Sequence, residues 1–331
     1  MIPTSQEVLA GLAPHFGTTL ADLAYFNGGR DESDGVLYVY PYKDAQRLLK
    51  IMAIPEKEQQ RALFRLDERL KFVHFLGEHG AQVAYPLLAP RDVLYETLPY
   101  DGHVWVAYTM AIAPGKTPAP QTWSPDFFRN WGQMLGLLHR LTQRYPSWKG
   151  AVLPDTGEVT LTWREEWQGF YDWCQDETVR EKWVELKQVL EELPVTREVF
   201  GFIHNDPHLW NLLVDGDSIT LLDFDVANHH WFATDIAIAC QSVLFAQTGG
   251  MDRPVYDRDK LRRFFTLFME GYEREHHLPA EWLDWLDVFV AYRRILLFTV
   301  MYEGIRSRPE SYASWKNMIL MQPEVLGTFS K

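Results

Sequence analysis

The segment of residues 203–225 constrains this chain more than any other part of it, because it combines two short apolar runs with a polar turn. Residues 212–214 and 219–222 are rich in side chains that favour β-strands. The four residues between them, Asp-Gly-Asp-Ser, are typical of a hairpin turn. The segment therefore predicts an antiparallel hairpin.

Three polar side chains are expected at the open end of this hairpin. Asn211 and Asp223 flank the paired runs, so the hairpin brings them to the same end, and Asp206 precedes that end by one short loop. Phosphoryl transfer needs such a set, because magnesium is held by oxygen ligands and a carboxylate must receive the hydroxyl proton. An ordinary acidic hairpin is the alternative, but it would have to match the spacing, the strands, the turn and the final Asp by chance.

The spacing of these residues resembles that of kinases. Four residues separate Asp206 from Asn211, as in the kinase catalytic loop, and Asp223-Phe224-Asp225 stands where kinases have Asp-Phe-Gly. Together with His204, these residues match the His-x-Asp, Asn and final Asp pattern of the aminoglycoside phosphotransferase family, which also includes choline kinases. Through them the chain resembles that family over roughly residues 23–242.

The resemblance implies an α+β, bilobal, protein-kinase-like fold, with an N-terminal antiparallel sheet carrying one helix and a mainly helical C-terminal lobe. It implies that Asp206 is the catalytic base, that Asn211 and Asp223 hold Mg²⁺, and that His204 supports the loop backbone. Asp225, at the position of the kinase Gly, is a departure from protein kinases that this family tolerates.

Local patterns predict two lobes of different class. In residues 1–111, strands are expected at 36–40 and 47–53, a helix at 56–78, and a second strand pair around Asp101-Gly102. An interlobe linker is expected near residues 111–115, and residues 112–331 should form the catalytic and substrate-binding lobe. Ser124-Pro125 is a strong helix start, and further helices are expected near 163–193, 234–248, 257–276 and 279–305.

The first lobe offers candidate residues for ATP. Gly28 and Gly29 precede a strand, as a phosphate-covering loop would, although Gly-Gly there is also common in plain turns. Lys50 interrupts an apolar strand, an awkward place for a charge unless a phosphate and a helix carboxylate are its partners. Glu68 is the candidate carboxylate, with Asp67, Glu58 and Glu56 as rivals.

The linker is the expected adenine site. A kinase-fold nucleotide lays its base against the backbone that joins the lobes and uses one carbonyl and one amide there. Met110 and Ile112, on either side of Ala111, are the candidates.

The composition limits the classes of ligand and the cellular location that are expected for this chain. A formal charge of −13 argues against a nucleic-acid surface and fits a cationic substrate, though solubility alone is an equal explanation. No apolar stretch reaches the roughly 20 residues of a membrane span, and no secretion signal is evident, so a cytoplasmic protein is expected. Cys174 and Cys240 suggest neither a disulfide framework nor a zinc site and are expected to be plain buried thiols.

Several aromatic, histidine and aspartate residues outside the predicted catalytic segment have a structural interpretation. A helical stripe of aromatic side chains is typical of core packing, with a cage for quaternary ammonium as the alternative; it comprises Trp163, Trp167, Phe170, Tyr171 and Trp173. His139 is expected to be structural, under the catalytic loop. His229 and His230 are expected on the surface or in a loop, and Asp235 is expected to cap a helix or to buttress the loop.

The function predicted from these observations is transfer of the γ-phosphoryl group of ATP, with Mg²⁺, to a hydroxyl of a small, cationic or aminoglycoside-like acceptor. Five acids near the start of the second lobe could attract such an acceptor; they are Glu165, Glu166, Asp172, Asp176 and Glu177. Two alternatives stay open, a Ser/Thr protein kinase of the same fold and a catalytically silent nucleotide-binding scaffold. Oligomeric state is not predicted.

Overall fold

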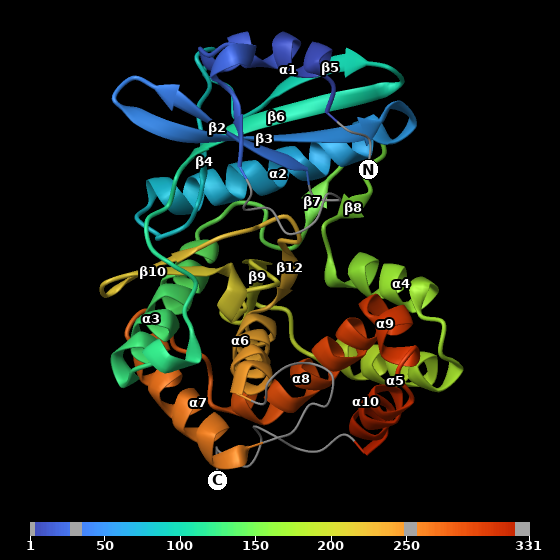
Figure 1. Cartoon of the computed structure of the whole chain (residues 1–331). Helices are drawn as coiled ribbons and strands as arrows, with labels where there is room; N and C mark the ends of the chain where they lie inside the picture. The colour runs from blue at the N-terminus through green and yellow to red at the C-terminus, as the bar shows by residue number, and fades with distance from the viewer. Residues whose placement is uncertain (1–3, 27–34, 248–256, 322–331) are drawn as a thin grey trace. The chain divides into compact units, whose positions relative to one another are not determined.

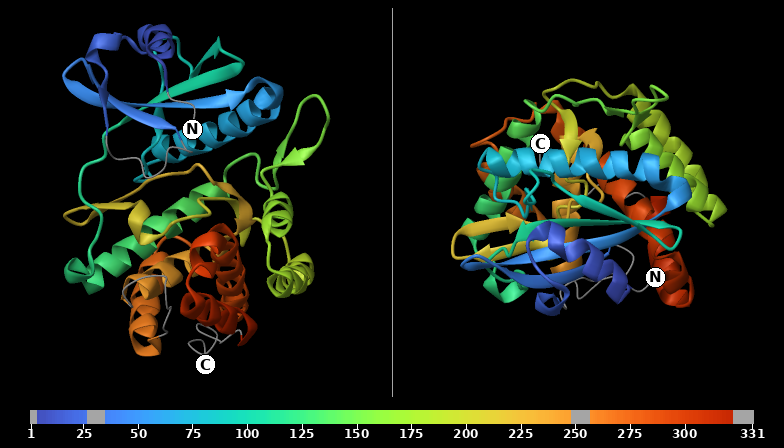
Figure 2. Two further views of the ribbon diagram at one scale, coloured as in Figure 1. Left: turned by 45° about the vertical axis from the view of Figure 1, so that its right-hand side comes forward. Right: turned by 90° about the horizontal axis from the view of Figure 1, so that it is seen from above.

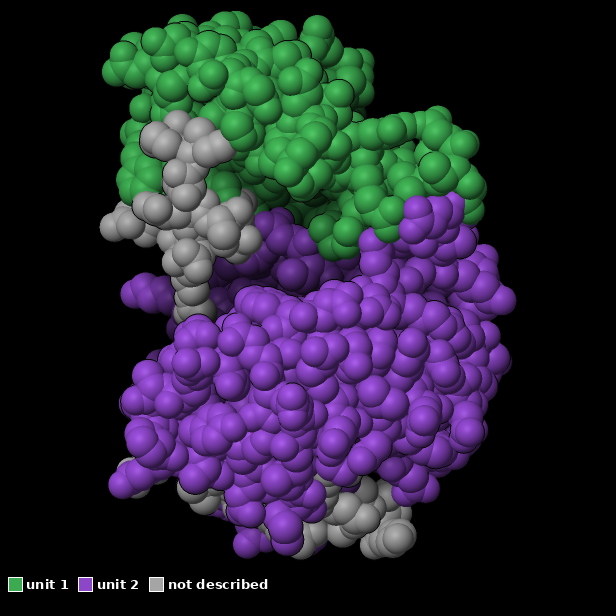
Figure 3. All heavy atoms as spheres, turned by 90° about the vertical axis from the view of Figure 1, so that its right-hand side faces the viewer, with its two compact units in different colours: residues 1–114, 153–157 green, residues 115–152, 158–331 purple. Residues whose placement is uncertain are grey.

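The computed structural model describes residues 4–26, 35–247 and 257–321. The chain divides into two compact units, shown in different colours in Figure 3. Unit 1 comprises residues 1–114 and 153–157, and unit 2 comprises residues 115–152 and 158–331. Gly28 and Gly29 lie outside the described residues.

Unit 1 is built on an antiparallel sheet with the strand order β1-β2-β3-β6-β4, and β5 also pairs with β6 (Figure 1). Its strands are β1 (Ala24–Tyr25), β2 (Val36–Tyr42), β3 (Ala45–Pro55), β4 (Pro86–Leu87), β5 (Glu96–Tyr100) and β6 (His103–Ala111). The two predicted hairpins, β2 with β3 and β5 with β6, are confirmed. The first turn is tighter than expected, because the strands continue to Tyr42 and Ala45 and Lys43 adopts a φ of 54°.

Helices cover both faces of this sheet. On one face, α1 (Gln6–Leu12) packs its buried Leu9 and Leu12 against Leu49 and Ile51 of β3. On the other face lies α2 (Gln59–Glu78), whose Leu63 and Leu66 pack against the side chains of Ile54 and Val106. Side chains alternate along a strand, so Lys50 shares the α2 face of β3. Short 3₁₀ turns complete unit 1; they are η1 (Ala13–Phe16), η2 (Leu20–Asp22) and η4 (Glu56–Glu58).

Unit 2 is mainly helical, as predicted. Its helices are α3 (Pro125–Thr142), α4 (Trp163–Trp173), α5 (Glu177–Glu192), α6 (Phe232–Gln247), α7 (Arg258–Tyr272), α8 (Glu281–Val300), α9 (Tyr302–Arg306) and α10 (Pro309–Met321), with 3₁₀ turns η5 (Pro120–Thr122) and η6 (Leu209–Asn211). Three two-stranded sheets join them: β7 (Ala151–Val152) with β8 (Val159–Thr160), β9 (Phe200–Ile203) with β12 (Asn228–Trp231), and β10 (Leu212–Asp215) with β11 (Ser218–Leu221).

Helices α3 and α7 lie against each other at glycines, and both views of the ribbon show them side by side (Figures 1 and 2). A Cβ atom on Gly132 would lie 1.8 Å from the carbonyl oxygen of Phe268, and one on Gly271 would lie 1.9 Å from that of Arg129. The two backbones are therefore closer than any side chain would permit. This packing places Tyr272 of α7 against His139 of α3.

Two long helices expected from the sequence are each interrupted. The pattern at 163–193 forms α4 and α5, because the Asp176 carboxylate accepts a hydrogen bond from the Val179 amide at 3.1 Å and starts a new helix. The pattern at 279–305 forms α8 and α9, separated by Met301. The start of α3 is as predicted, with Ser124 Oγ accepting from the Phe127 amide at 3.0 Å. Among the described residues, no helix has both the length and the apolarity to cross a membrane.

The expectation of exposed histidines at 229 and 230 was wrong. Both side chains are fully buried in β12, which pairs with β9 in the interior of unit 2. Burial lowers the pKa of His229 to about 4 and that of His230 to about 3, because a charged ring would lose its hydration there. Both cysteines are buried and free, as expected.

Candidate active site

The predicted hairpin, formed by β10 and β11, and the loop that precedes it lie between β9 and β12 in the sequence of unit 2. Strands β10 and β11 pair from Leu212 with Leu221 to Asp215 with Ser218. The pairing continues one step further, since the Leu222 amide donates to the Asn211 carbonyl at 2.8 Å. Asn211 and Asp223 therefore lie at the same end of the hairpin, as the sequence predicted. The loop of residues 204–211, called the catalytic loop below, connects β9 to this end.

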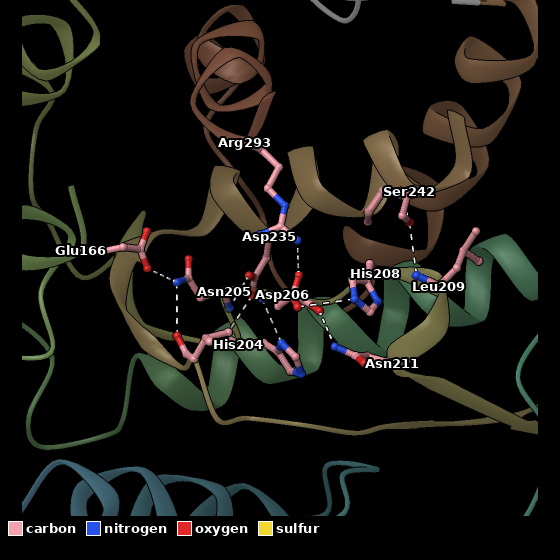
Figure 4. Close-up of polar contacts among 12 residues, drawn as sticks. Glu166, His204, Asn205, Asp206, His208, Leu209, Asn211, Asp235, Ser242 and Arg293 are labelled. Atoms are coloured by element: carbon pink, nitrogen blue, oxygen red, sulfur yellow. Dashed lines mark hydrogen bonds and ion pairs between the residues drawn. The ribbon is translucent and has the colours of Figure 1, made fainter. Parts of the chain in front are cut away.

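Asp235 of α6 holds the start of the catalytic loop (Figure 4). Its Oδ1 accepts from the Asn205 amide at 2.8 Å, and its Oδ2 accepts from the His204 amide at 3.2 Å. The loop needs this support because Asn205 adopts a left-handed φ of 67°. Burial raises the pKa of Asp235 to about 7, against the opposing effect of His204 and the two amides. The buttress role, one of the two expected for Asp235, is the one observed.

His139 braces Asp235 from α3. Its Nε2 lies 3.2 Å from Asp235 Oδ2, and its Nδ1 lies 2.7 Å from the Tyr272 hydroxyl. Burial lowers the pKa of His139 to about 3, so the ring is neutral. A neutral ring that donates from Nε2 to Asp235 and accepts the tyrosine proton at Nδ1 satisfies both contacts. The structural role predicted for His139 follows from this chain of hydrogen bonds.

His204 links the catalytic loop to the far strand of the hairpin. The Asp206 amide donates to His204 Nδ1 at 3.1 Å, so the proton of the ring is on Nε2, which donates to the Leu222 carbonyl at 2.7 Å. Burial is the main cause that lowers the pKa of His204, in agreement with a neutral ring. The histidine thereby supports the loop backbone, as its position in the sequence pattern implied.

The side chain of Asp206 is 22% exposed and contacts two basic side chains. Its Oδ1 accepts a hydrogen bond from Nη2 of Arg293 in α8, and its Oδ2 lies 3.4 Å from Nε2 of His208 (Figure 4). The hydrogen bonds described above for the amides of residues 204–206 are accepted by Asp235 and His204, and none of these three uses the Asp206 carboxylate. Arg293 was not predicted, although Arg293-Arg294 interrupts the apolar second half of a helix and could have drawn attention.

The two predicted metal ligands have oxygen atoms suited to Mg²⁺. Asn211 Nδ2 donates to the Asp206 carbonyl at 3.0 Å, which orients the amide and leaves its Oδ1 outside that bond. Asp223 is exposed, has a φ of 62°, and accepts from the Asp225 amide at 3.4 Å. In the described part of the chain, no three His, Cys, Asp or Glu side chains gather as a metal site. One carboxylate and one amide oxygen suit an ion that keeps most of its waters.

Glu166 of α4 is a second residue that the sequence did not single out for this role. Its Oε2 accepts from the side-chain amides of Asn205 and, at 3.2 Å, Asn228, and its Oε1 accepts from the Tyr292 hydroxyl at 2.9 Å. Burial is the largest effect on its pKa and raises it, while these donors and Arg293 act in the opposite direction. Glu166 thus ties the catalytic loop to α4, β12 and α8.

The candidate ATP residues of unit 1 are placed as follows. Lys50 is 9% exposed, and its cross-strand neighbours are Leu37 and Tyr108. Glu68 is 13% exposed and lies 3.7 Å from the ammonium of Lys71. Burial raises the pKa of Glu68 more than Lys71 lowers it. The proposed pairing of Lys50 with Glu68 stays a prediction.

The two linker candidates stand at the end of β6. Met110 pairs with Leu48 of β3 and with Pro86 of β4, and it is partly exposed. Ile112 follows the last residue of the strand and is 38% exposed. Their expected contact with adenine stays a prediction.

The aromatic stripe of α4 packs within unit 2. Trp163 and Trp167 are buried, and basic side chains of the chain itself lie over the rings of Trp167 and Tyr171. Lys187 Nζ lies 4.1 Å from the Trp167 ring and the Arg180 guanidinium 4.4 Å from the Tyr171 ring. Core packing, the preferred interpretation, agrees with this arrangement.

Comparison with known proteins places these observations in a family. The model of the "Phosphotransferase enzyme family" matches residues 42–278. The amicoumacin kinase of Bacillus subtilis (strain 168) is 25% identical over 303 residues, which cover 90% of this chain and 85% of that protein. The family resemblance inferred from the sequence is confirmed.

Solved structures show the same fold. An amicoumacin kinase solved with AMP-PNP, Ca²⁺ and Ami has a TM-score of 0.77 and 23% identity, and the match covers 92% of this chain and 90% of that one. A microcompartment-associated aminopropanol kinase has a TM-score of 0.63 and 19% identity, with 96% and 97% covered. These matches confirm the predicted α+β kinase-like fold.

Proposed function

Because the chain belongs to the phosphotransferase enzyme family, we propose that it is a kinase that moves the γ-phosphoryl group of ATP to a hydroxyl of a small, positively charged acceptor. The observation that carries this proposal is that different residues of the site hold the backbone of the catalytic loop and present a carboxylate. Asp235 and His204 hold the loop backbone, so the partly exposed Asp206 carboxylate is available for a hydroxyl proton.

In the proposed reaction, the acceptor hydroxyl donates a hydrogen bond to Asp206. Its oxygen forms a bond to the γ-phosphorus as the bond from that phosphorus to the β–γ bridging oxygen breaks. The electron pair of the broken bond leaves with ADP, and the hydroxyl proton passes to the Asp206 carboxylate. His204 and Asp235 keep the carboxylate in place during the transfer.

Asn211 and Asp223 would hold Mg²⁺, which neutralises phosphate charge when it is bound. Asn211 Oδ1 is suited to this because the amide nitrogen is already used on the Asp206 carbonyl. In unit 1, Lys50 would bind phosphate oxygens and Glu68 would orient the lysine. Gly28 and Gly29 would approach the phosphates, and the backbone at Met110 and Ile112 would receive the adenine.

A small acceptor is favoured over a protein substrate by the chain that follows Asp223. Only residues 224–227 separate it from β12, and β12 is buried and paired along its whole length with β9. A peptide therefore has no long segment there to organise it. The relatives support this choice, because two of them are named as kinases of amicoumacin and of aminopropanol, which are small molecules. We also propose a cytoplasmic location, where ATP is available.

The test is a coupled ADP-release screen over aminoglycosides, choline, homoserine, methylthioribose and related amino alcohols, with a generic protein substrate in parallel. We expect magnesium-dependent ADP release with at least one small acceptor. The same signal should vanish in Asp223→Ala. A signal that survived in that variant, or that required the protein substrate, would contradict the proposal.

A further inference from the structure

Arg293 places a permanent positive charge against Asp206. Its Nη2 donates to Asp206 Oδ1, and its side chain is only 12% exposed (Figure 4). A guanidinium offers N–H donors in a planar fork, has no acceptor, and does not lose its proton in proteins. Any molecule that brings a hydroxyl group to Asp206 therefore meets this cation at the same carboxylate.

The helix that carries Arg293 is firmly packed. The neighbouring Tyr292 is buried and donates its hydroxyl to Glu166 Oε1 at 2.9 Å, and Ile295 is buried as well. Tyr292 also packs edge to face against Trp183, with ring centroids 5.1 Å apart. The Cα of Arg293 is thus held by the core, and only the end of its side chain is free to adjust to a ligand.

Two carboxylates lie within the electrostatic reach of the guanidinium. Asp206 is hydrogen-bonded to it, and Glu166 interacts with it through their opposite charges. Glu166 is itself occupied by Asn205, Asn228 and Tyr292. Among the described residues, Asp206 is the only carboxylate that accepts a hydrogen bond from Arg293, so the remaining N–H groups of the guanidinium can also donate to a ligand that reaches Asp206.

We propose, on the basis of the function proposed above, that Arg293 is a specificity-determining residue that selects acceptors with an oxygen atom on the carbon next to the reacting hydroxyl. Vicinal diols and 2-hydroxy carbonyl compounds have this arrangement. An oxygen there accepts an N–H of the guanidinium, whereas an ammonium there is repelled and has no lone pair to offer. Positive charge on the acceptor is then tolerated only further from the reacting hydroxyl.

A pair of small probes tests this directly. Propane-1,2-diol and 1-amino-2-propanol differ only in the hydroxyl or ammonium group next to the secondary hydroxyl. Turnover is measured by ADP release with Mg²⁺ and ATP, and binding by ligand-detected NMR with the full chain. We expect the wild-type protein to prefer the diol by about tenfold or more, as expected for like charges held this close at a partly buried site.

Variants at Arg293 should change this preference in a graded way. Arg293→Met should bring the ratio of turnover with the diol to turnover with the amino alcohol close to one. Arg293→Lys keeps the charge but loses the planar fork of donors, so it should give an intermediate ratio. Arg306→Met is the matched control. Arg306 is 54% exposed on α9 and pairs with Glu303, so its replacement should leave the ratio unchanged.

The outcomes separate this inference from the proposed function. If the wild-type protein treats the probes alike in turnover and in binding, including no response to either, the inference is wrong. The inference is equally wrong if Arg293→Met lowers turnover with both probes by the same factor. That result is expected of an arginine that only neutralises the charges of Asp206 and Glu166. If Arg293→Met does not fold, the wild-type and Arg293→Lys ratios decide. Magnesium-dependent ADP release that is lost in Asp223→Ala tests the proposed function separately.

Discussion

The catalytic loop has one acidic residue, Asp206, whereas the helix pair α4 and α5 is rich in them, and the two regions use their carboxylates differently. In the helix pair, carboxylates hold the structure together. Glu165 accepts from the Thr160 hydroxyl and the Leu161 amide, both at 2.9 Å. Asp176 caps α5 and accepts from Lys316 and Tyr312 of α10, both at 2.5 Å.

In the catalytic loop, the backbone amides are held by Asp235, which lies outside the loop, and by His204 of the loop itself. Asp235 and His204 accept the amides of residues 204–206, and Asp206 keeps its carboxylate for side chains and ligands. The comparison teaches that the role of an acid depends on whether the backbone around it needs an acceptor. The acidic residues of α4 and α5, expected from the sequence to attract the acceptor, are for the most part already engaged within the fold.

The largest expected effect is on activity alone. Asp206→Asn removes the proton acceptor, so we expect turnover to fall by about a thousandfold, within the range found for general bases. The loop backbone does not depend on this carboxylate, so the free energy of unfolding should change by less than about 1 kcal/mol. Steady-state ADP release and urea unfolding measure the two quantities. A variant that lost stability but retained turnover would overturn the comparison.

The second prediction concerns a substitution that should lower both turnover and the free energy of unfolding. Asp235→Asn replaces one acceptor oxygen with an NH₂ group that faces the amides and His139, so we expect a loss of about 3 kcal/mol in unfolding free energy. Turnover should fall as well, because Asn205 and His204 lose their support. Thermal unfolding and ADP release provide the measurements. An unchanged melting temperature would show that the loop holds its shape without Asp235.

The third prediction concerns Glu166, the acid of α4 that reaches the catalytic loop. Glu166→Gln keeps the size of the side chain but replaces one acceptor, so Asn205 and the loop should shift slightly. We expect kcat to fall by about tenfold while KM for ATP stays the same, as for a positioning residue. Parallel ATP and acceptor titrations give these constants, and circular dichroism measures the folded fraction, because unfolded protein would also lower the apparent kcat without changing KM.

The fourth prediction is a pH dependence in the helix pair. Burial alone would raise the pKa of Asp176, but the donors Lys316, Tyr312 and the Val179 amide lower it overall. A lowered pKa means that the stabilisation is present above the unfolded-state pKa of about 3.9 and is lost as the pH falls through the lower folded-state value. Asp176→Asn should therefore cost about 1–2 kcal/mol at pH 7.

The difference between Asp176→Asn and the parent protein should become smaller below about pH 4. Urea unfolding of both proteins across this range checks the sign. A difference that grew on acidification would mean that Asp176 is not the charged partner of Lys316.

The smallest effect is expected at Glu177, which is exposed in the first turn of α5. Glu177→Gln should change stability by less than about 0.5 kcal/mol, the usual range for surface substitutions and weak helix-dipole effects. It should not alter ADP release. This variant is the control for the other acids, and a clear loss of acceptor affinity would instead support the expectation from the sequence that Glu177 helps to attract the acceptor.

Features set by neighbouring residues were predictable from the sequence. The hairpin of β10 and β11, the start of α3 at Ser124 and the β5–β6 turn depend on alternation, capping and turn residues that are adjacent in the chain. The break between α4 and α5 was missed, because the apolar spacing continues across it and only the cap at Asp176 marks the new helix. His229 and His230 were placed outside because the pair lacks a third metal ligand at suitable spacing, although the apolar Trp231-Phe232 that follows could have signalled burial.

The sequence by itself determined the family, the catalytic loop and the end of the hairpin where Asn211 and Asp223 meet, because each of these follows from spacing within one short segment. Only the tertiary structure decided which distant residues surround Asp206. Arg293 is 87 positions away from Asp206, and Glu166 is 39 positions away from Asn205. Their proximity results from the packing of α4, α6 and α8, which no local pattern encodes.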